Sequence, residues 1–171
     1  MLMNREWAMP SGDTFSIKPI SELLDRYLAG ATVVIDPFAR TSKRGTITND
    51  LNPEMPTNYH LHADVFLDEM LAQKTVADVV LFDPPYSLRQ CKEIYNGIGK
   101  DFTQHDSQDA VRWVHAKTAA ANLLKSGGVC VSFGWNSQGL GKKNGMEIIE
   151  ILLVAHGGGH NDTIVTVERK L

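Results

Sequence analysis

The sequence has few cysteines and lacks the long apolar segments that membrane-spanning helices need. Cys91 and Cys130 are the two cysteines among 171 residues, and no CxxC pair is present. This excludes a disulfide framework and gives no support for a cysteine-based zinc site. Because residues 1–10 also lack the pattern of a signal peptide, we expect a cytoplasmic protein without a membrane partner.

An excess of basic residues is also missing. The formal net charge is −3, with 43% hydrophobic and 22% charged residues. This composition is typical of a globular domain and argues against a strongly basic nucleic-acid binder, although a local basic face around a site remains compatible with it. Low-complexity segments, repeats and interdomain linkers are absent too, so residues 1–171 are predicted to form one domain.

What the sequence does contain is an alternation of helical and extended apolar patterns. Three stretches predict helices from the spacing of their apolar positions, namely residues 16–28, 63–74 and 110–124. Six short runs predict strands, namely residues 32–35, 45–49, 77–82, 129–133, 147–155 and 163–167. The last two are joined by a short glycine-rich connection. We therefore expect an α/β fold with a mostly parallel sheet and a C-terminal antiparallel hairpin.

Acidic residues end three of the predicted strands. Asp36, Asp50 and Asp83 each follow an extended apolar run. Each alone is typical of a turn or a helix cap. In an open α/β sheet, however, ligands bind at the carboxyl ends of the strands, so the three carboxylates together predict a site at one edge of the sheet.

The tetrapeptide after residues 77–82 is the sharpest signal. It consists of Asp83, Pro84, Pro85 and Tyr86. Two prolines hold the chain rigid, and Pro85 has no N–H that competes for the Pro84 carbonyl. The Asp83 carboxylate and this carbonyl can act as two acceptors for one NH2 group, and Tyr86 offers a flat face for a planar base.

This tetrapeptide resembles the DPPY motif of N6-adenine DNA methyltransferases. In that family the Asp and the first Pro carbonyl bind the target amino group, and the Tyr stacks on the flipped base. The resemblance implies catalytic roles for Asp83, Pro84, Pro85 and Tyr86, with DNA as the partner. It also implies S-adenosyl-L-methionine as the cofactor and the Rossmann-like fold of S-adenosylmethionine-dependent methyltransferases.

Residues upstream extend the resemblance to the family's cofactor-binding block. Family members place a Lys-Pro helix before a strand that ends in Asp-Pro-Phe, and this chain has Lys18-Pro19 and then Asp36-Pro37-Phe38. The cofactor-binding candidates that this block implies are Thr14, Phe15, Lys18, Asp36, Pro37 and Phe38, with Asp83 at the border between cofactor and substrate.

The chain departs from the family in the loop after Phe38. Where the family usually has a DPFxGSGT loop, Arg40 replaces the first expected glycine and a basic turn through Lys43 follows. Because glycine allows close backbone approach to the cofactor, a degenerate and inactive site is one interpretation. The other is that Arg40 and Lys43 contact nucleic-acid phosphate or the cofactor carboxylate.

Further positions have weaker signals. Asp50 is an acceptor candidate for cofactor ribose hydroxyls, with an Asx-turn as the alternative. Asp64 and Val65 match the family position that meets the cofactor adenine, although a helix cap also explains Asp64. The substrate-binding candidates are Tyr86, Arg89, Trp135, Asn136 and His160.

Two segments near these candidates are rich in polar or flexible residues. Residues 87–107 interleave basic and aromatic side chains, a composition that fits a lid or a nucleic-acid contact, or a plain solvated loop with part of a helix. Residues 156–162 contain two histidines and an aspartate, but further ligands are not apparent. We therefore expect no metal and a mobile hairpin loop beside the substrate.

The resemblance covers nearly the whole chain but leaves no room for a separate target-recognition region. It suggests a small enzyme of the kind found on phages, with specificity from loops, a homodimer or a partner subunit. The alternatives are a guanine-N2 RNA methyltransferase, which also uses Asp-Pro-Pro-Tyr or Phe, and a non-catalytic nucleic-acid-binding module. A protein N5-glutamine methyltransferase is more distant, since that group has Asn at the place of Asp83.

Overall fold

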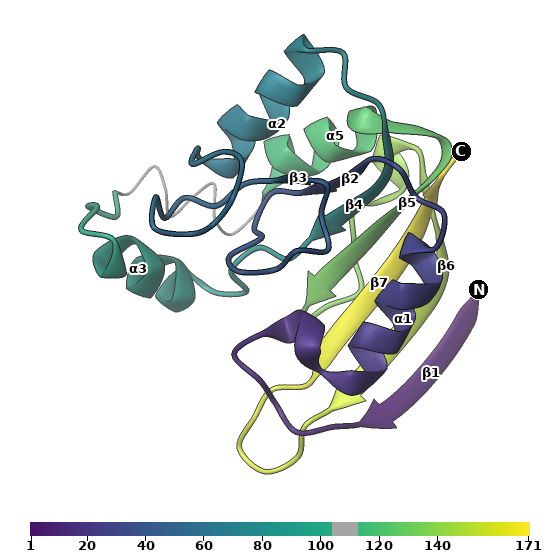
Figure 1. The fold of residues 1–171 in the computed structure, drawn as a ribbon. Coiled ribbons are helices and arrows are strands. Elements are labelled where there is room, and N and C mark those ends of the chain that lie inside the picture. Colours follow the sequence, from purple (N-terminus) through teal and green to yellow (C-terminus); the bar gives the residue numbers. More distant parts are fainter. Residues whose placement is uncertain (104–112) are drawn as a thin grey trace.

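The computed structural model describes residues 1–103 and 113–171, and within them the chain forms a seven-stranded sheet in the order β1-β6-β7-β5-β4-β2-β3 (Figure 1). The strands are β1 Leu2–Trp7, β2 Val34–Asp36, β3 Ile47–Thr48, β4 Ala77–Phe82, β5 Leu124–Gly134, β6 Met146–Ala155 and β7 Thr163–Lys170. The helices are α1 Lys18–Leu28, α2 Ala63–Ala72, α3 Leu88–Gly97 and α5 Val114–Leu123, with 3-10 turns at Thr14–Ser16 and Lys142–Asn144.

The strand directions confirm the predicted fold class. Strands β3, β2, β4 and β5 run parallel to one another, and β7 lies antiparallel between β5 and β6. The hairpin of β6 and β7 is the expected C-terminal antiparallel pair. The carboxyl ends of β2, β3 and β4 therefore meet at one edge of the sheet, where ligands bind in this architecture.

Helices cover the two faces of the sheet in separate layers (Figure 1). Alternate residues of β4 point to opposite faces, so Val79 and Leu81 pack with α1 whereas Val80 and Phe82 pack with α2 and α5. Burial on both faces explains why β4 is apolar at almost every position. The exception, Asp78, accepts hydrogen bonds from the backbone N–H groups of Thr32 and Val33.

The sequence did not indicate the first strand. All six residues of β1, Leu2–Trp7, are exposed, and the strand is held by parallel pairing with β6. Its mixed sequence lacks an alternating pattern, so only the long-range pairing makes it a strand.

Several boundaries differ from the predicted ones. The second predicted strand shortens to β3 Ile47–Thr48, and β5 begins at Leu124, upstream of residue 129. The third predicted helix is seen as α5 Val114–Leu123, while residues 110–112 lie outside the described part of the chain.

The polar segment at residues 87–107 contains a complete helix, α3 Leu88–Gly97, rather than a plain loop. The Ser87 hydroxyl caps it by accepting a hydrogen bond from the Gln90 N–H at 3.2 Å. Residues 104–107 of this segment lie outside the described residues. In the described part of the chain no helix has the length and apolar character needed to cross a bilayer.

Candidate functional site

The three acidic residues predicted to share one edge of the sheet do lie close together. Asp36 is the last residue of β2, Asp83 follows β4, and Asp50 follows β3. Both Asp83 and Asp50 contribute to raising the pKa of Asp36 through charge repulsion, which requires their proximity. The topology therefore brings together residues that lie far apart in the sequence.

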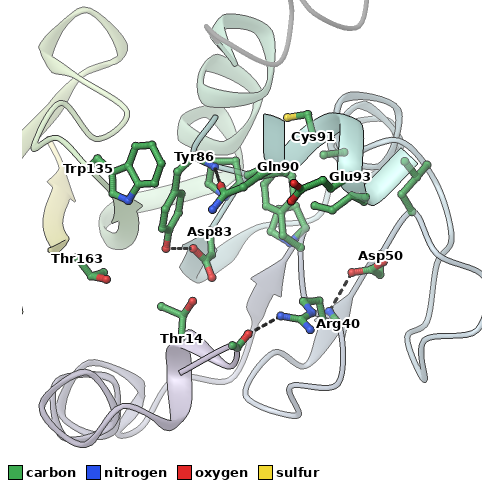
Figure 2. Close-up of a pocket in the computed structure, with 18 of the residues that line it drawn as sticks. Thr14, Arg40, Asp50, Asp83, Tyr86, Gln90, Cys91, Glu93, Trp135 and Thr163 are labelled. Atoms are coloured by element: carbon green, nitrogen blue, oxygen red, sulfur yellow. Dashed lines mark hydrogen bonds between the residues drawn. The ribbon is translucent and has the colours of Figure 1, made fainter. Parts of the chain in front are cut away.

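A cavity of about 750 Å³ opens at this edge (Figure 2). Its size is typical of small-molecule and cofactor sites. Of the residues predicted from the sequence, its lining includes Thr14, Pro37, Phe38, Asp50, Asp83, Pro84, Pro85, Tyr86, Trp135 and His160. Arg40 lines it as well.

The turn after β4 forms the centre of the cavity wall. The Tyr86 hydroxyl donates a hydrogen bond of 2.5 Å to Asp83 Oδ1, and the Tyr86 N–H donates one of 2.6 Å to Gln90 Oε1 (Figure 2). The turn is thereby tied to α3. In this conformation one oxygen of the Asp83 carboxylate accepts the hydrogen bond from Tyr86.

The Asp83 carboxyl has an unusual proton affinity. Burial raises its pKa to about 6, against hydrogen bonds from Tyr86 and Thr14 and the charge of Arg40, which act in the opposite direction. The group is therefore ionised at neutral pH but becomes protonated in mildly acidic solution. Such a carboxyl in a cleft is a candidate for binding and proton transfer.

Two aromatic rings stand next to this carboxyl. The rings of Tyr86 and Trp135 are 5.8 Å apart between centroids and meet edge to face at 68°. Trp135 is 42% exposed at the end of β5, so a planar ligand can reach its face. The pair offers a stacking surface directly beside the acceptors of the Asp83–Pro84 turn.

Arg40 adopts a backbone conformation that favours glycine. Its φ is +50°, in the left-handed region. The Arg40 N–H donates to Asp50 Oδ2 at 3.0 Å, and the guanidinium donates to the Gly12 carbonyl at 2.5 Å. The loop thus keeps the left-handed backbone that a glycine would allow, and it adds a cation at the edge of the cavity.

Asp36 lies directly behind this loop. It is fully buried, and its Oδ1 accepts a hydrogen bond from the Phe38 N–H at 3.2 Å. Its Oδ2 has no hydrogen-bond partner among the described residues. Burial raises the pKa of Asp36 well above its ordinary value. A Cβ on Gly45 would lie 2.8 Å from the Asp36 Cβ, so only glycine fits there.

Seven predicted site residues do not line the cavity, namely the fully buried Asp36, Asn136 and five others. Phe15 packs against Phe133 in the core, with ring centroids 4.9 Å apart. The other four are Lys18, which is exposed and 3.9 Å from Glu22, Asp64 in the first turn of α2, the exposed Val65, and Arg89, which pairs with Glu93 at 2.8 Å. Asn136 lines an adjoining cavity instead.

Other residues line the cavity without having been predicted from the sequence. They are chiefly Gly12, Leu61, His62, Ala63, Gln90, Trp113 and Thr163. Leu61 and His62 immediately precede α2 and Ala63 begins it, so this segment reaches the cavity next to the position expected for the cofactor adenine. No local pattern marks Trp113 or Thr163, since only tertiary packing brings them to this edge.

His156 also lines the cavity, but its ring is engaged by the protein. Nδ1 lies 2.8 Å from the Ala8 carbonyl and Nε2 lies 2.8 Å from the Thr163 hydroxyl. Because a carbonyl only accepts, Nδ1 donates to it, and in the neutral ring Nε2 then accepts from Thr163. Among residues 1–103 and 113–171, no group of side chains is suited to hold a metal ion.

Comparison with known proteins identifies the fold. No protein-family model matches the sequence, and no curated protein matches it significantly. TrmN from Thermus thermophilus is 17% identical, with a TM-score of 0.50 over 91% of this chain and 49% of TrmN. NSun6 from Pyrococcus horikoshii, solved with SFG, is 16% identical, with a TM-score of 0.55 over 88% of this chain and 51% of NSun6.

A structure of similar size shares the fold as well. SMU.1697c from Streptococcus mutans, solved in complex with SAH, is 11% identical, with a TM-score of 0.51 over 87% of this chain and 96% of that protein. The chain spans about half the length of TrmN and of NSun6. At these identities the likeness extends to the fold and does not single out the N6-adenine DNA group. The chain has the Rossmann-like fold of S-adenosylmethionine-dependent methyltransferases.

Proposed function

We propose that this protein transfers a methyl group from S-adenosyl-L-methionine to the exocyclic N6 amino group of adenine in DNA. The observation that carries the proposal is the Asp83–Tyr86 turn at the carboxyl end of β4. It combines a carboxylate with a pKa of about 6, a proline carbonyl and the Tyr86 ring, and Trp135 adds a second ring to the same cavity wall. These are the groups that an amino group on a planar base requires.

The residues of the cavity fit the proposed cofactor. Asp50 lines the cavity and also forms an Asx turn, in which its Oδ1 accepts from the Asn52 N–H at 2.8 Å. In this proposal its carboxylate accepts hydrogen bonds from ribose hydroxyls as well, and the Leu61–Ala63 segment forms a wall for the adenine ring. The carboxylates of Asp50 and Asp83 both line the cavity, and together they make this region favourable for a positively charged sulfonium. When bound, S-adenosyl-L-methionine supplies an electrophilic methyl group.

Arg40 supports the same placement. Its guanidinium lies at the cavity edge among carboxylates, and among the described lining residues it is the one lysine or arginine cation that can meet the methionine carboxylate. This favours cofactor binding by Arg40 over the interpretation of a degenerate loop. Lys43, the other basic residue of the loop considered for such a contact, does not line the cavity.

The side chains around Asp83 would prepare the amino group for attack. N6 of adenine is a poor nucleophile because its lone pair is delocalised into the ring. Hydrogen bonds from N6 to Asp83 and to the Pro84 carbonyl would orient it, while Tyr86 and Trp135 stack on the base. Asp83 can then take up the proton that N6 loses as the N–C bond forms and the S–C bond breaks.

Methyl transfer assays on different nucleic acids test the proposal. The protein is incubated with labelled S-adenosyl-L-methionine and duplex DNA, single-stranded DNA or RNA, and the products are digested to nucleosides. We expect N6-methyladenine from DNA. Label in RNA alone would instead support the guanine-N2 alternative, and a folded protein that labels nothing would support a binding module.

The pKa of Asp83 predicts a pH profile. Because the ionised carboxylate is the form that accepts from N6, kcat/KM for the methyl donor should rise with pH and level off above about 6. Below that value kcat/KM should fall about tenfold per pH unit, because protonation of a single group removes the acceptor. The inflection should lie at the pKa of the free enzyme, since kcat/KM reports that form. The Asp83→Asn variant should lack this inflection in its pH profile. A flat profile of the wild-type enzyme between about pH 5 and 8 would contradict the assignment of Asp83 as the titrating acceptor.

A further inference from the structure

A second cavity, of about 620 Å³, adjoins the first one. The two share Pro84, Pro85, Tyr86, Trp113 and Trp135 in their walls, so the turn after β4 and the stacking pair separate them. The remainder of the second wall comes from α5, from the end of β5 and from the loop that precedes β6. The catalytic roles proposed above do not use this second cavity.

The two cavities differ in charge. The first is lined by the carboxylates of Asp50, Asp83 and Glu93, together with Arg40. The second is lined by Lys117 and Lys143, and none of its described lining residues has a carboxylate. In a chain with a net charge of −3, this separation places cation-binding groups on one side of Tyr86 and anion-binding groups on the other.

Lys117 is prepared for an anionic ligand. Its side chain is half-buried on α5, and its ammonium has no hydrogen-bond or ion-pair partner among the described residues. Burial lowers its pKa, as does the neighbouring charge of Lys143, whereas Glu168 raises it. A partly desolvated ammonium of this kind gains from a bound anion.

The nearby acid, Glu168, is already engaged by the backbone. Its carboxylate accepts hydrogen bonds from the N–H groups of Leu140, at 2.6 Å, and Gly141, at 2.9 Å. Burial raises the pKa of Glu168. Glu168 therefore holds the loop at Leu140 and Gly141, which forms part of the wall of the second cavity. It forms no direct ion pair with the ammonium of Lys117 among the described contacts.

We propose that this second cavity binds the phosphodiester backbone of the nucleic-acid strand that contains the target base. The inference rests on the proposed function, because it places that base against Tyr86 and Trp135. A base held there remains joined to its sugar and to the flanking phosphates. The strand that carries these phosphates must therefore run out of the first cavity beside the same two rings. Lys117 and Lys143 lie on the wall directly beyond them.

Binding of a strand without any methyl donor tests this proposal. A fluorescent single-stranded oligodeoxynucleotide is titrated with the full chain over a series of salt concentrations. The Lys143→Ala variant should weaken binding several-fold at low salt and reduce the slope of log K against log salt by about 0.7, the value for one phosphate contact. Lys142→Ala is the matched control, because Lys142 is the adjacent lysine, is also exposed, and does not line the cavity.

A second variant covers the buried position. Lys117→Met keeps the apolar stem and removes the charge, and combined with Lys143→Ala it should reduce the slope by about 1.4. Equal slopes for the Lys143→Ala and Lys142→Ala variants would overturn the proposal. A second result would also overturn it, namely that the protein binds adenosine monophosphate tightly through Lys143 but does not bind the oligonucleotide. The ligand of the cavity would then be a free nucleotide.

The outcome is independent of the methyl transfer assay. If Lys143 governs strand binding but no nucleic acid is methylated, the proposed function fails and the phosphate site remains. If DNA is methylated but Lys143→Ala behaves like Lys142→Ala, the proposed function remains and the phosphate site is wrong.

Discussion

Replacing Asp83 with alanine should lower the rate of methyl transfer by about 10²–10⁴-fold, the range for loss of a positioned proton acceptor. The change removes the carboxylate that Tyr86 contacts at 2.5 Å and that the proposed mechanism uses as the acceptor for the target amino group. Because Asp50 and Arg40 line another part of the cavity and stay intact, the affinity for S-adenosyl-L-methionine should change little. Steady-state rates with DNA and calorimetric titration with the methyl donor measure the two effects separately.

Two further variants separate the roles of charge and shape at this position. Glu54→Ala removes an exposed carboxylate outside the cavity and should leave the rate unchanged. Asp83→Asn keeps an acceptor oxygen but cannot take up a proton at neutral pH, so its rate should lie between those of the wild type and Asp83→Ala. Full activity of Asp83→Ala would remove this residue from the mechanism.

Replacing Arg40 with glycine should weaken the binding of S-adenosyl-L-methionine by roughly tenfold to a hundredfold, as expected for loss of about 1.5–3 kcal/mol from a charged hydrogen bond. Glycine is the informative substitution because it adopts the observed φ of +50° without strain, whereas the guanidinium is lost. The folded loop should therefore persist, and calorimetry reports the missing cation alone.

The Arg40→Gly variant also decides between the two interpretations of this loop. If the arginine obstructs a degenerate site, its removal restores the glycine of the usual pattern and should tighten binding instead. Lys43→Ala removes a cation from the same loop outside the cavity and should have no effect. A thermal melt shows whether loss of the hydrogen bond to the Gly12 carbonyl has loosened the structure.

The features that could be predicted from the sequence are those with a local cause. The apolar run Ala77–Phe82 followed by two prolines defines a buried strand and its rigid exit, whatever the remainder of the chain does. The acids at the ends of three such runs share an edge because parallel strands of an open α/β sheet have their carboxyl ends at the same side. The position of Asp83 and of its two acidic neighbours therefore follows from the local pattern together with the fold class.

Other predicted site residues show the limit of motif matching. Lys18 and Phe15 fall in the expected block of the sequence, yet the first is exposed on α1 and the second is packed against Phe133. The position of a residue in a motif determines the helix, strand or turn in which it lies. The face of that helix or turn on which its side chain lies determines what it contacts. Asp64 and Val65 differ from Ala63 in the same way, although they are its neighbours in α2.

By itself the sequence determined the alternation of strands and helices, the antiparallel hairpin and the Asp83–Tyr86 turn, because these depend on residues close to one another in the chain. Only the tertiary structure decided that Leu2–Trp7 is an edge strand, that Arg40 keeps a glycine-like backbone, and that Lys117 and Lys143 share a wall with Trp135. Each of these depends on segments brought together by packing of the sheet and its helices, and the energy of such contacts is not encoded in any short stretch of residues.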